Sequence, residues 1–475
     1  MSFRRIEEPL MTDVANSIRT IAWLRGDLRL DDNPALAAAV RRGKGGCTAI
    51  FVMTPEQWKQ HHWGEHRCGM MTGALTALRS GLDSKGIDLR VLRGSDDAAI
   101  AGVLLDVART LDASEIHANR EFGLNEERRD ESVRDELLAP DIDFIRHEDQ
   151  TILPIREIRS GGGTPYTVFT PFKNKWLALL QDTGIPELAT VGTARRNPKL
   201  DPDKFLPGEL DPSLESRPES MFEPGEEEPL RRLERFLDGP ILRYHEDRDT
   251  PSLDGTSTLS PWLACGSISP RRILHRLVDA HGPTIERWAE GPSVWLSELI
   301  WREFYRHVMD GIPRLSMDRP LHAWTNRVPW RDDDARFEAW SRGETGIGIV
   351  DAGMRQLDRT GWMHNRVRMI VATFLSKHLL IDWRRGERFF MNRLVDGDFP
   401  SNNGGWQWAA STGTDAAPYF RIFNPDRQAE RFDKEHEYIR TWVPEFDTAG
   451  AFPPIVDLKA ARVRAIETFK TAKNG

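Results

Sequence analysis

The chain has 475 residues, of which 39% are hydrophobic, so it can bury more than one core and two domains are expected. A net charge of −8 argues against binding nucleic acid through the overall field, so a DNA-binding protein of this composition needs a local basic face. No apolar run approaches the roughly 18 residues of a membrane helix. Three scattered cysteines give no disulfide framework, and the first twenty residues lack the apolar core of a signal peptide, so we expect a cytoplasmic protein.

The first third of the chain alternates short apolar runs with helical patterns, which is typical of a doubly wound parallel sheet. Asp31-Asp32-Asn33-Pro34 offers a helix N-cap followed by proline in the first turn. No G-x-G-x-x-G motif follows the first strand, so a standard dinucleotide site is not expected. We predict an N-terminal extension over residues 1–20 and an α/β domain over 21–150. The expected strands are 21–24, 49–53, 89–92, 115–118 and 144–145, and the expected helices include 34–42 and 70–85.

The chain then changes character. Residues 151–229 contain the run Gly161-Gly162-Gly163, many prolines and an acidic stretch around 223–228, which predicts a surface linker with better order at 166–176. From 230 to 475 helical periodicity dominates, so we predict an all-α second domain.

The stretch 295–306 places a carboxylate, an indole, a guanidinium and a phenol on one helical face, at Glu298, Trp301, Arg302 and Tyr305. Such a face suits a flat ligand with phosphate groups, because the indole can stack and the arginine can bind phosphate. The alternative is an ordinary amphipathic helix.

A second mixed face follows at Trp362, Asn365, Arg366 and Met369, with core packing as the alternative. Between residues 355 and 393 there are nine Lys or Arg against three Asp or Glu. Such a run is usually a solvated face, but its position beside an aromatic-rich helix strengthens the alternative of a nucleic-acid surface.

Asp396 and Asp398, followed by 402–408, could serve acid–base hydrolysis or a metal, but Asp-x-Asp alone is weak evidence. His61, His62, His66 and Cys68 fit no standard zinc spacing, and we expect no metal.

Several long motifs resemble the photolyase/cryptochrome family. They are Glu298-Leu-Ile-Trp-Arg-Glu-Phe-Tyr305, Thr360-Gly-Trp-Met-His-Asn-Arg366, the run from Asn402 to Asp415, Pro418-Tyr-Phe-Arg-Ile-Phe-Asn-Pro425, Trp23-Leu-Arg-Gly-Asp-Leu-Arg-Leu and Val168-Phe-Thr-Pro-Phe-Lys173. The likeness covers nearly the whole chain after residue 20 and is closest to bacterial class I enzymes for cyclobutane pyrimidine dimers. It implies a light-driven lyase in which reduced FAD, bound among helices, passes an electron to a dimer flipped out of DNA, with no net redox change.

The resemblance implies a set of FAD-binding residues in the helical domain. They are Tyr244, Thr256, Ser257, Thr258, Leu259, Ser260, Trp295, Asn365, Arg368, Asp396, Gly397, Asp398 and Asn402. Thr258 departs from the family pattern, since many relatives place Arg or Lys there, so one cationic partner of the FAD phosphates is missing.

The resemblance also implies residues for catalysis, DNA binding and electron transfer. Glu298, Trp301, Trp408, Met369 and Asn402, the last facing flavin N5, are the expected catalytic residues. The expected DNA contacts are Arg248, Glu298, Trp301, Arg302, Tyr305, Asn365, Arg366 and Gln428. Trp330, Trp383 and Trp406 match the family's tryptophan chain, which explains part of an unusual excess of 16 tryptophans over 5 tyrosines.

An antenna chromophore is implied in the N-terminal domain, where His61, Asn125 and Glu126 resemble a methenyltetrahydrofolate site. Ser316 and Met317 stand where folate-type enzymes often have Cys-Lys, so a deazaflavin antenna stays open as an alternative. The partner is DNA containing pyrimidine dimers, and we expect a monomer. Two other functions are alternatives. A cryptochrome is expected to extend past the flavin domain, where this chain has only a short helical tail at 460–473. A dark flavin oxidoreductase would need a nicotinamide motif, and none is present.

Overall fold

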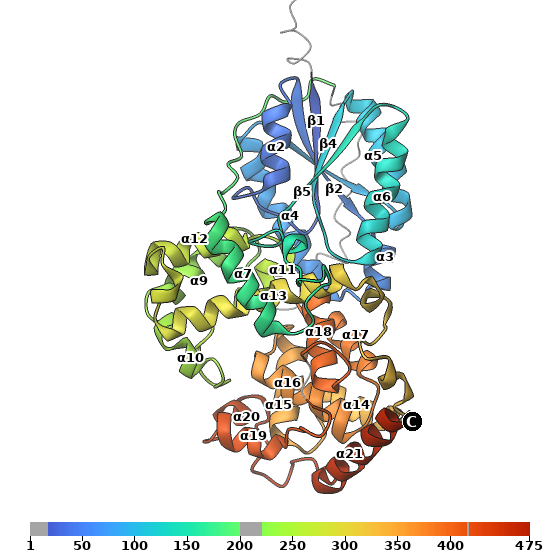
Figure 1. Cartoon of the computed structure of the whole chain (residues 1–475), viewed down its shortest axis with the longest axis vertical. Coiled ribbons are helices and arrows are strands. Elements are labelled where there is room, and N and C mark those ends of the chain that lie inside the picture. The colour runs from blue at the N-terminus through green and yellow to red at the C-terminus, as the bar shows by residue number, and fades with distance from the viewer. Residues whose placement is uncertain (1–17, 200–220, 416–417) are drawn as a thin grey trace, which may run out of the picture.

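The computed structural model describes residues 18–199, 221–415 and 418–475. Within them an α/β domain stands at one end of the molecule and a helical domain at the other (Figure 1). Most of the predicted N-terminal extension, residues 1–17, and part of the predicted linker, residues 200–220, lie outside the described residues.

The N-terminal domain is built on a five-stranded parallel sheet with the order β3-β2-β1-β4-β5. Side chains along β1 alternate between two cores, since Ala22 and Leu24 pack with helices α2 and α4, while Ile21 and Trp23 pack with α5 and α6. Helices therefore cover both faces, and the predicted doubly wound sheet is confirmed (Figure 1). The strands are β1 (Arg19–Leu24), β2 (Gly46–Met53), β3 (Asp88–Arg93), β4 (Glu115–Asn119) and β5 (Asp143–His147), and the helices are α2 (Pro34–Arg42), α3 (Pro55–Gln60), α4 (Glu65–Ser84), α5 (Asp97–Leu111) and α6 (Leu124–Leu138).

The predicted cap of the first helix is present. The Asn33 side chain accepts from the Leu36 amide at 3.1 Å, and Pro34 occupies the first turn of α2. Asn119, at the end of β4, donates to the same Asn33 oxygen at 2.8 Å. The cap thus also ties the loop after β1 to the neighbouring strand, at the carboxyl edge where such sheets form their sites.

The rest of the chain is helical, as predicted. Only an isolated bridge, Arg331 with Ile381, adds β pairing among the described residues of this part. The segment after β5 contains η1 (Ile155–Glu157) and α7 (Phe169–Thr183). The helical domain contains α9 (Glu227–Leu237), η2 (Pro240–Arg243), α10 (Tyr244–Asp247), α11 (Ser260–Cys265), α12 (Pro270–His281), η3 (Ile285–Arg287), α13 (Glu290–Gly311), η4 (Pro313–Met317), η5 (Ala323–Arg327), α14 (Asp334–Arg342), α15 (Gly348–Thr360), α16 (Asn365–Thr373), the π-helical η6 (Phe374–His378), α17 (Trp383–Arg393), α18 (Phe399–Ala410), α19 (Pro425–Phe432), α20 (Glu437–Trp442) and α21 (Leu458–Asn474).

Element bounds differ from the sequence expectations by a few residues. β1 begins at Arg19, α7 lies inside the segment 151–229 predicted as linker, and α9 begins at Glu227. The domain boundaries themselves stay a prediction. Among the described residues, no helix combines the length and apolar character that crossing a bilayer requires.

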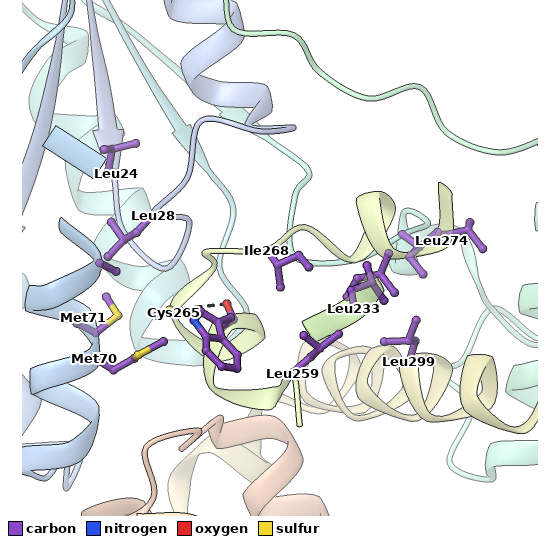
Figure 2. Packing of buried hydrophobic residues seen from close by; sticks show 14 of the residues in the cluster. Leu24, Leu28, Met70, Met71, Leu233, Leu259, Cys265, Ile268, Leu274 and Leu299 are labelled. Carbon is purple, nitrogen blue, oxygen red and sulfur yellow. Dashed lines mark hydrogen bonds between the residues drawn. The ribbon is translucent and has the colours of Figure 1, made fainter. Parts of the chain in front are cut away.

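A continuous apolar core joins the two domains. Leu28, Met70 and Met71 of the α/β domain pack in one cluster with Cys265 and Ile268 of the helical domain (Figure 2). Burying apolar side chains from both sides favours a fixed relative position of the domains.

Buried charges at the same interface add directional contacts. Arg29, on the loop after β1, pairs with Asp149 and donates to the Gly266 carbonyl at 3.0 Å. Arg271, on α12, donates to Asp149 at 2.8 Å and pairs with Asp32 at 2.9 Å. Because each arginine bonds partners from the opposite domain, these contacts fix the geometry of anything bound between the domains.

Candidate functional site

The helical domain encloses a cavity of about 520 Å³, here called the central cavity. Its walls come from α10, the loop 256–260, α13, α16 and α18. The structure brings most of the predicted site residues together here: Tyr244, Arg248, Thr256, Ser257, Thr258, Leu259, Ser260, Trp295, Glu298, Trp301, Arg302, Tyr305, Asn365, Arg366, Arg368, Met369, Asp396, Asp398, Asn402, Trp406 and Trp408. A cavity of this size, mostly apolar with a few converging polar groups, is typical of a cofactor site.

The loop 256–260 forms one end of the cavity with four hydroxyl-bearing residues. Thr258 has a φ of +48°, an uncommon conformation for a β-branched residue. Its hydroxyl accepts a hydrogen bond of 2.7 Å from Arg232, which lies on α9 outside the cavity lining. Arg232 therefore places a positive charge next to Thr258, the position where many relatives have Arg or Lys.

Helix α13 supplies the wall of Glu298, Trp301 and Tyr305, as the helical spacing predicted. Arg248 donates to Glu298 at 2.7 Å, and burial raises the pKa of Glu298 although Arg248 opposes the shift. The Trp301 ring stacks on Phe169 with centroids 3.7 Å apart and an angle of 6°. One face of the indole is thereby fixed by the protein.

Arg302 is half-buried on α13 and lines the central cavity. It donates to the backbone carbonyls of Leu263 and Gln150, and burial together with Arg306 lowers its pKa to about 9. These bonds hold the guanidinium in place, and its predicted DNA contact stays a prediction.

Helix α16 begins later than the motif suggested. His364 is its N-cap and Asn365 its first residue, so Trp362 precedes the helix. Trp362 nevertheless lines the central cavity with Asn365, Arg366 and Met369, because the chain turns at Gly361, which has a φ of +68°. The predicted shared face is therefore formed by a turn followed by a helix.

The two aspartates of the Asp-x-Asp motif have separate partners. Arg368 donates to Asp396 Oδ2 at 2.8 Å, while Asp396 Oδ1 is buried with no hydrogen-bond partner among the described residues. Burial alone would raise the pKa of Asp398, but Arg306 and Arg302 lower it to about 2. Each carboxylate is paired with an arginine, and Asp396 retains a free acceptor for a bound hydroxyl or N–H group.

Asn402 lies on α18 at the inner wall. Its Nδ2 donates to the Glu387 backbone carbonyl at 3.0 Å and lies 3.4 Å from the Glu387 carboxyl. Burial raises the pKa of that carboxyl to about 8. With Nδ2 engaged, the Oδ1 of Asn402 is left as an acceptor for a ligand in the cavity.

The three predicted electron-transfer tryptophans lie on adjoining segments. Trp406 lines the central cavity, and a Cβ on Gly386 would meet its ring at 2.1 Å, so it packs on α17 one turn after Trp383. Trp383 is buried, whereas Trp330 is half-buried beside the bridge that joins Arg331 to Ile381. The segments thus lead from the cavity outward. Of the residues predicted for FAD, the lesion, DNA and electron transfer, those that do not line the central cavity are Gly397, Trp330, Trp383 and Gln428.

A second cavity of about 390 Å³, here called the interdomain cavity, lies between the α/β domain and α17–α18. The predicted antenna residues line it, with Asn125 Nδ2 3.1 Å from His61 Nε2 and the pKa of Glu126 raised to about 7 by burial. Trp58 and Trp63 stack at 5.2 Å, and the Arg67 guanidinium lies 3.7 Å above Trp63. Aromatic faces and a cation suit a flat, anionic ligand.

Sequence reasoning missed the residues that stand behind the motifs: Arg232, Asp249, Glu387, Trp63 and Arg67. Asp249 pairs with Arg366 at 2.7 Å although 117 residues separate them in the sequence. Glu387 contacts Asn402, which lies fifteen residues further along the chain. Such long-range partners leave no pattern in the sequence. Only Trp63 and Arg67 could have been found from the sequence, because they are four residues apart, the spacing of one helical turn, and close to His61.

Comparison with known proteins agrees with this geometry. Residues 20–190 match the family model described as DNA photolyase, and residues 295–452 match that of the FAD binding domain of DNA photolyase. The second match covers α13 to α20, which build most of the central cavity.

Full-length relatives are similar along nearly the whole chain. A deoxyribodipyrimidine photo-lyase of Escherichia coli (strain K12) is 42% identical over 96% of this chain and 99% of its own, and one of Salmonella typhimurium is 43% identical over the same shares. The crystal structure of a bacterial class III photolyase from Agrobacterium tumefaciens superposes with a TM-score of 0.84 at 34% identity, covering 97% of this chain and 98% of the other.

Proposed function

This chain belongs to the DNA photolyase family, and from that premise we propose how its cavities bind FAD, an antenna chromophore and a damaged DNA base. The activity is light-dependent repair of cyclobutane pyrimidine dimers, that of a deoxyribodipyrimidine photo-lyase. The observation that carries the residue assignments is the convergence of Glu298, Trp301, Trp408 and Asn402 on one cavity.

FAD fits the deep part of the central cavity. The unpartnered Oδ1 of Asp396 offers an acceptor to a ribityl hydroxyl or a ring N–H group, and the hydroxyls of loop 256–260 offer donors to phosphate. Arg232 behind Thr258 and Arg368 beside Asp396 provide positive charge at the two ends. The remaining holders are Tyr244, Trp295, Asn365, Gly397 and Asp398.

Bound reduced FAD supplies the light-excited electron that splits the dimer. The protein's part is positioning. Glu298 is to accept hydrogen bonds from the N–H groups of a flipped base, since a carboxylate with two oxygens can meet two donors. Trp301, held flat by Phe169, and Trp408 give apolar surfaces to a lesion, and Met369 closes the same wall. Asn402 presents Oδ1 to the flavin ring without adding a negative charge.

Trp406, Trp383 and Trp330 form the proposed route by which electrons reach an oxidised flavin. The order follows burial, since Trp406 lines the cavity and Trp330 is half-buried. Gly386 is required for this route, because any side chain there would displace the Trp406 ring from α17.

The interdomain cavity is the proposed antenna site. We assign it to methenyltetrahydrofolate, held by His61, Asn125 and Glu126, with deazaflavin as the alternative. Burial keeps the pKa of Glu126 near 7, so the carboxyl can donate as well as accept in neutral solution. Ser316 and Met317 provide no charge to the ligand, but Arg67, which lies over the Trp63 ring, provides a cation from a different element.

DNA is the proposed partner of the cavity mouth, where Arg248 and Arg366 lie beside Glu298, Tyr305 and Asn365. Gln428 lies on α19, whose Phe432 ring packs against Arg366. Arg248 and Arg366 are the cations offered to DNA phosphate here, and each is paired with a carboxylate in the free protein. We further propose that the protein acts as a monomer in the cytoplasm.

The test is repair of a duplex containing one thymine dimer by reduced, illuminated protein. Glu298→Ala should lower lesion affinity roughly tenfold or more, because hydrogen bonds to a charged group contribute about 1.5–3 kcal/mol. Glu290→Gln, at the exposed start of the same helix, should repair normally. Unchanged repair by Glu298→Ala would remove Glu298 from the mechanism, and absence of repair by the unmodified protein would refute the function.

A further inference from the structure

Four charged side chains form a continuous chain at the mouth of the central cavity. Arg248 Nη1 lies 2.7 Å from Glu298 Oε1, and Arg248 Nε lies 4.0 Å from Asp249 Oδ1. Asp249 Oδ1 in turn accepts from Arg366 Nη2 at 2.7 Å and from Arg366 Nε at 3.2 Å. The chain connects the end of α10 to α13 and α16.

Both arginines assigned to DNA are therefore already engaged with carboxylates. Asp249 Oδ1 accepts from both the Nε–H and the Nη2–H group of Arg366, and these are donors that arginine can also offer to a phosphate. The Arg366 guanidinium also lies 4.5 Å above the Phe432 ring, which limits its other positions. A DNA phosphate and the Asp249 carboxylate thus compete for the same donors.

The second pair is held differently. Burial raises the pKa of Glu298, and Arg248, whose Nη1 lies 2.7 Å from Glu298 Oε1, is the main group that opposes this shift. Removing Arg248 leaves Glu298 with an unmet acceptor unless another donor arrives. A flipped pyrimidine has such donors, whereas stacked undamaged DNA presents only phosphate to this position.

We propose that Asp249 stands in for a DNA phosphate in the free protein, so that a phosphate reaches Arg366 only by displacing the Asp249 carboxylate. This inference rests on the proposed function of the same site. Every DNA that contacts Arg366 meets this cost, but only a flipped base adds contacts to Glu298 that offset it, so Asp249 holds the occupancy of undamaged DNA low.

Asp249→Asn tests this directly, because it keeps the side-chain shape and removes the charge. Affinity is measured by fluorescence anisotropy in the dark, with FAD-loaded protein and a labelled duplex with or without one thymine dimer. Affinity for the undamaged duplex should rise about two- to fivefold, the size of a partly exposed ion pair. Affinity for the dimer duplex should rise by a similar factor, because both duplexes displace Asp249, and binding to undamaged DNA should depend more steeply on salt.

Glu246→Gln is the matched control, since it removes one negative charge from α10, the short helix just before Asp249, where Glu246 pairs only with Arg243 and His245 in the described part of the chain. An equal gain in both variants would mean a general field effect and would overturn the proposal. So would weaker binding by Asp249→Asn, which would make Asp249 a support for Arg366. Adding Arg366→Gln should cancel the gain from Asp249→Asn, and a persisting gain would also overturn it.

Failure of the proposed function has a different signature. If the unmodified protein bound dimer and undamaged duplexes equally, the lesion site itself would be wrong, whatever Asp249→Asn did.

Discussion

The two cavities of this protein are built in different ways. The central cavity is formed within one domain by α13, α16 and α18, and its polar groups sit in contiguous motifs such as 298–305 and 402–408. The interdomain cavity combines residues from both domains, among them Trp63 of the N-terminal domain and Glu387 of α17. Contiguous motifs therefore position the polar groups of the central cavity, whereas the interdomain cavity depends on how the two domains pack.

The largest expected effect comes from interrupting the proposed electron route to the central cavity, which leaves the interdomain cavity unchanged. Trp330→Phe should abolish photoreduction of oxidised flavin, because phenylalanine does not replace an oxidisable indole, while repair by enzyme already reduced continues. Transient absorption after blue-light excitation provides the measurement. Trp324→Phe is the control, since Trp324 also packs edge-on against Phe469. Full-rate photoreduction in Trp330→Phe would exclude Trp330 as terminal donor.

The next effect concerns Glu387, which lines the interdomain cavity and bonds Asn402 of the central one. Burial raises its pKa from 4.5 to about 8, so between these values the folded protein keeps a proton that the unfolded chain loses. Stability should therefore fall as pH rises from 4.5 to 8, by at most on the order of 4 kcal/mol.

Glu387→Gln should remove that part of the pH dependence, as seen in urea unfolding at pH 5 and pH 8.5. The variant should gain stability relative to the natural protein at the higher pH. Parallel curves for the two proteins would show that Glu387 does not titrate in this window.

A smaller effect is expected for Arg232→Gln, which removes the cation behind Thr258. FAD affinity should fall about tenfold, since hydrogen bonds that involve a charged group contribute about 1.5 kcal/mol or more. Flavin fluorescence during reconstitution measures it. Arg231→Gln, an exposed neighbour that shares Glu228, is the control. Adding Thr258→Arg should restore affinity, and no recovery would argue against a shared electrostatic role.

The smallest effect should be that of Arg67→Gln in the interdomain cavity. Loss of one cation beside Trp63 should weaken binding of methenyltetrahydrofolate about fivefold. The near-ultraviolet absorption band measures occupancy, while FAD content and repair under direct excitation stay unchanged. Arg79→Gln, exposed on the same helix, is the control. Equal loss in both variants would exclude Arg67 from the site.

The sequence alone predicted the doubly wound parallel sheet and the mixed face of α13, while most lining residues of the central cavity were expected only from the family resemblance. It could do so because alternation, helical spacing and caps act over a few residues, as at Asn33 and from Glu298 to Tyr305. Long contiguous motifs also carried the family likeness.

Only the tertiary structure decided which groups support those motifs. Arg232 reaches Thr258 across 26 residues, and Asp249 reaches Arg366 across 117. It also tied the Arg302 guanidinium to backbone carbonyls, since its partners come from the loop after β5 and from α11. Charge pairing and burial depend on distance in space, and one sequence without its fold contains no record of that distance.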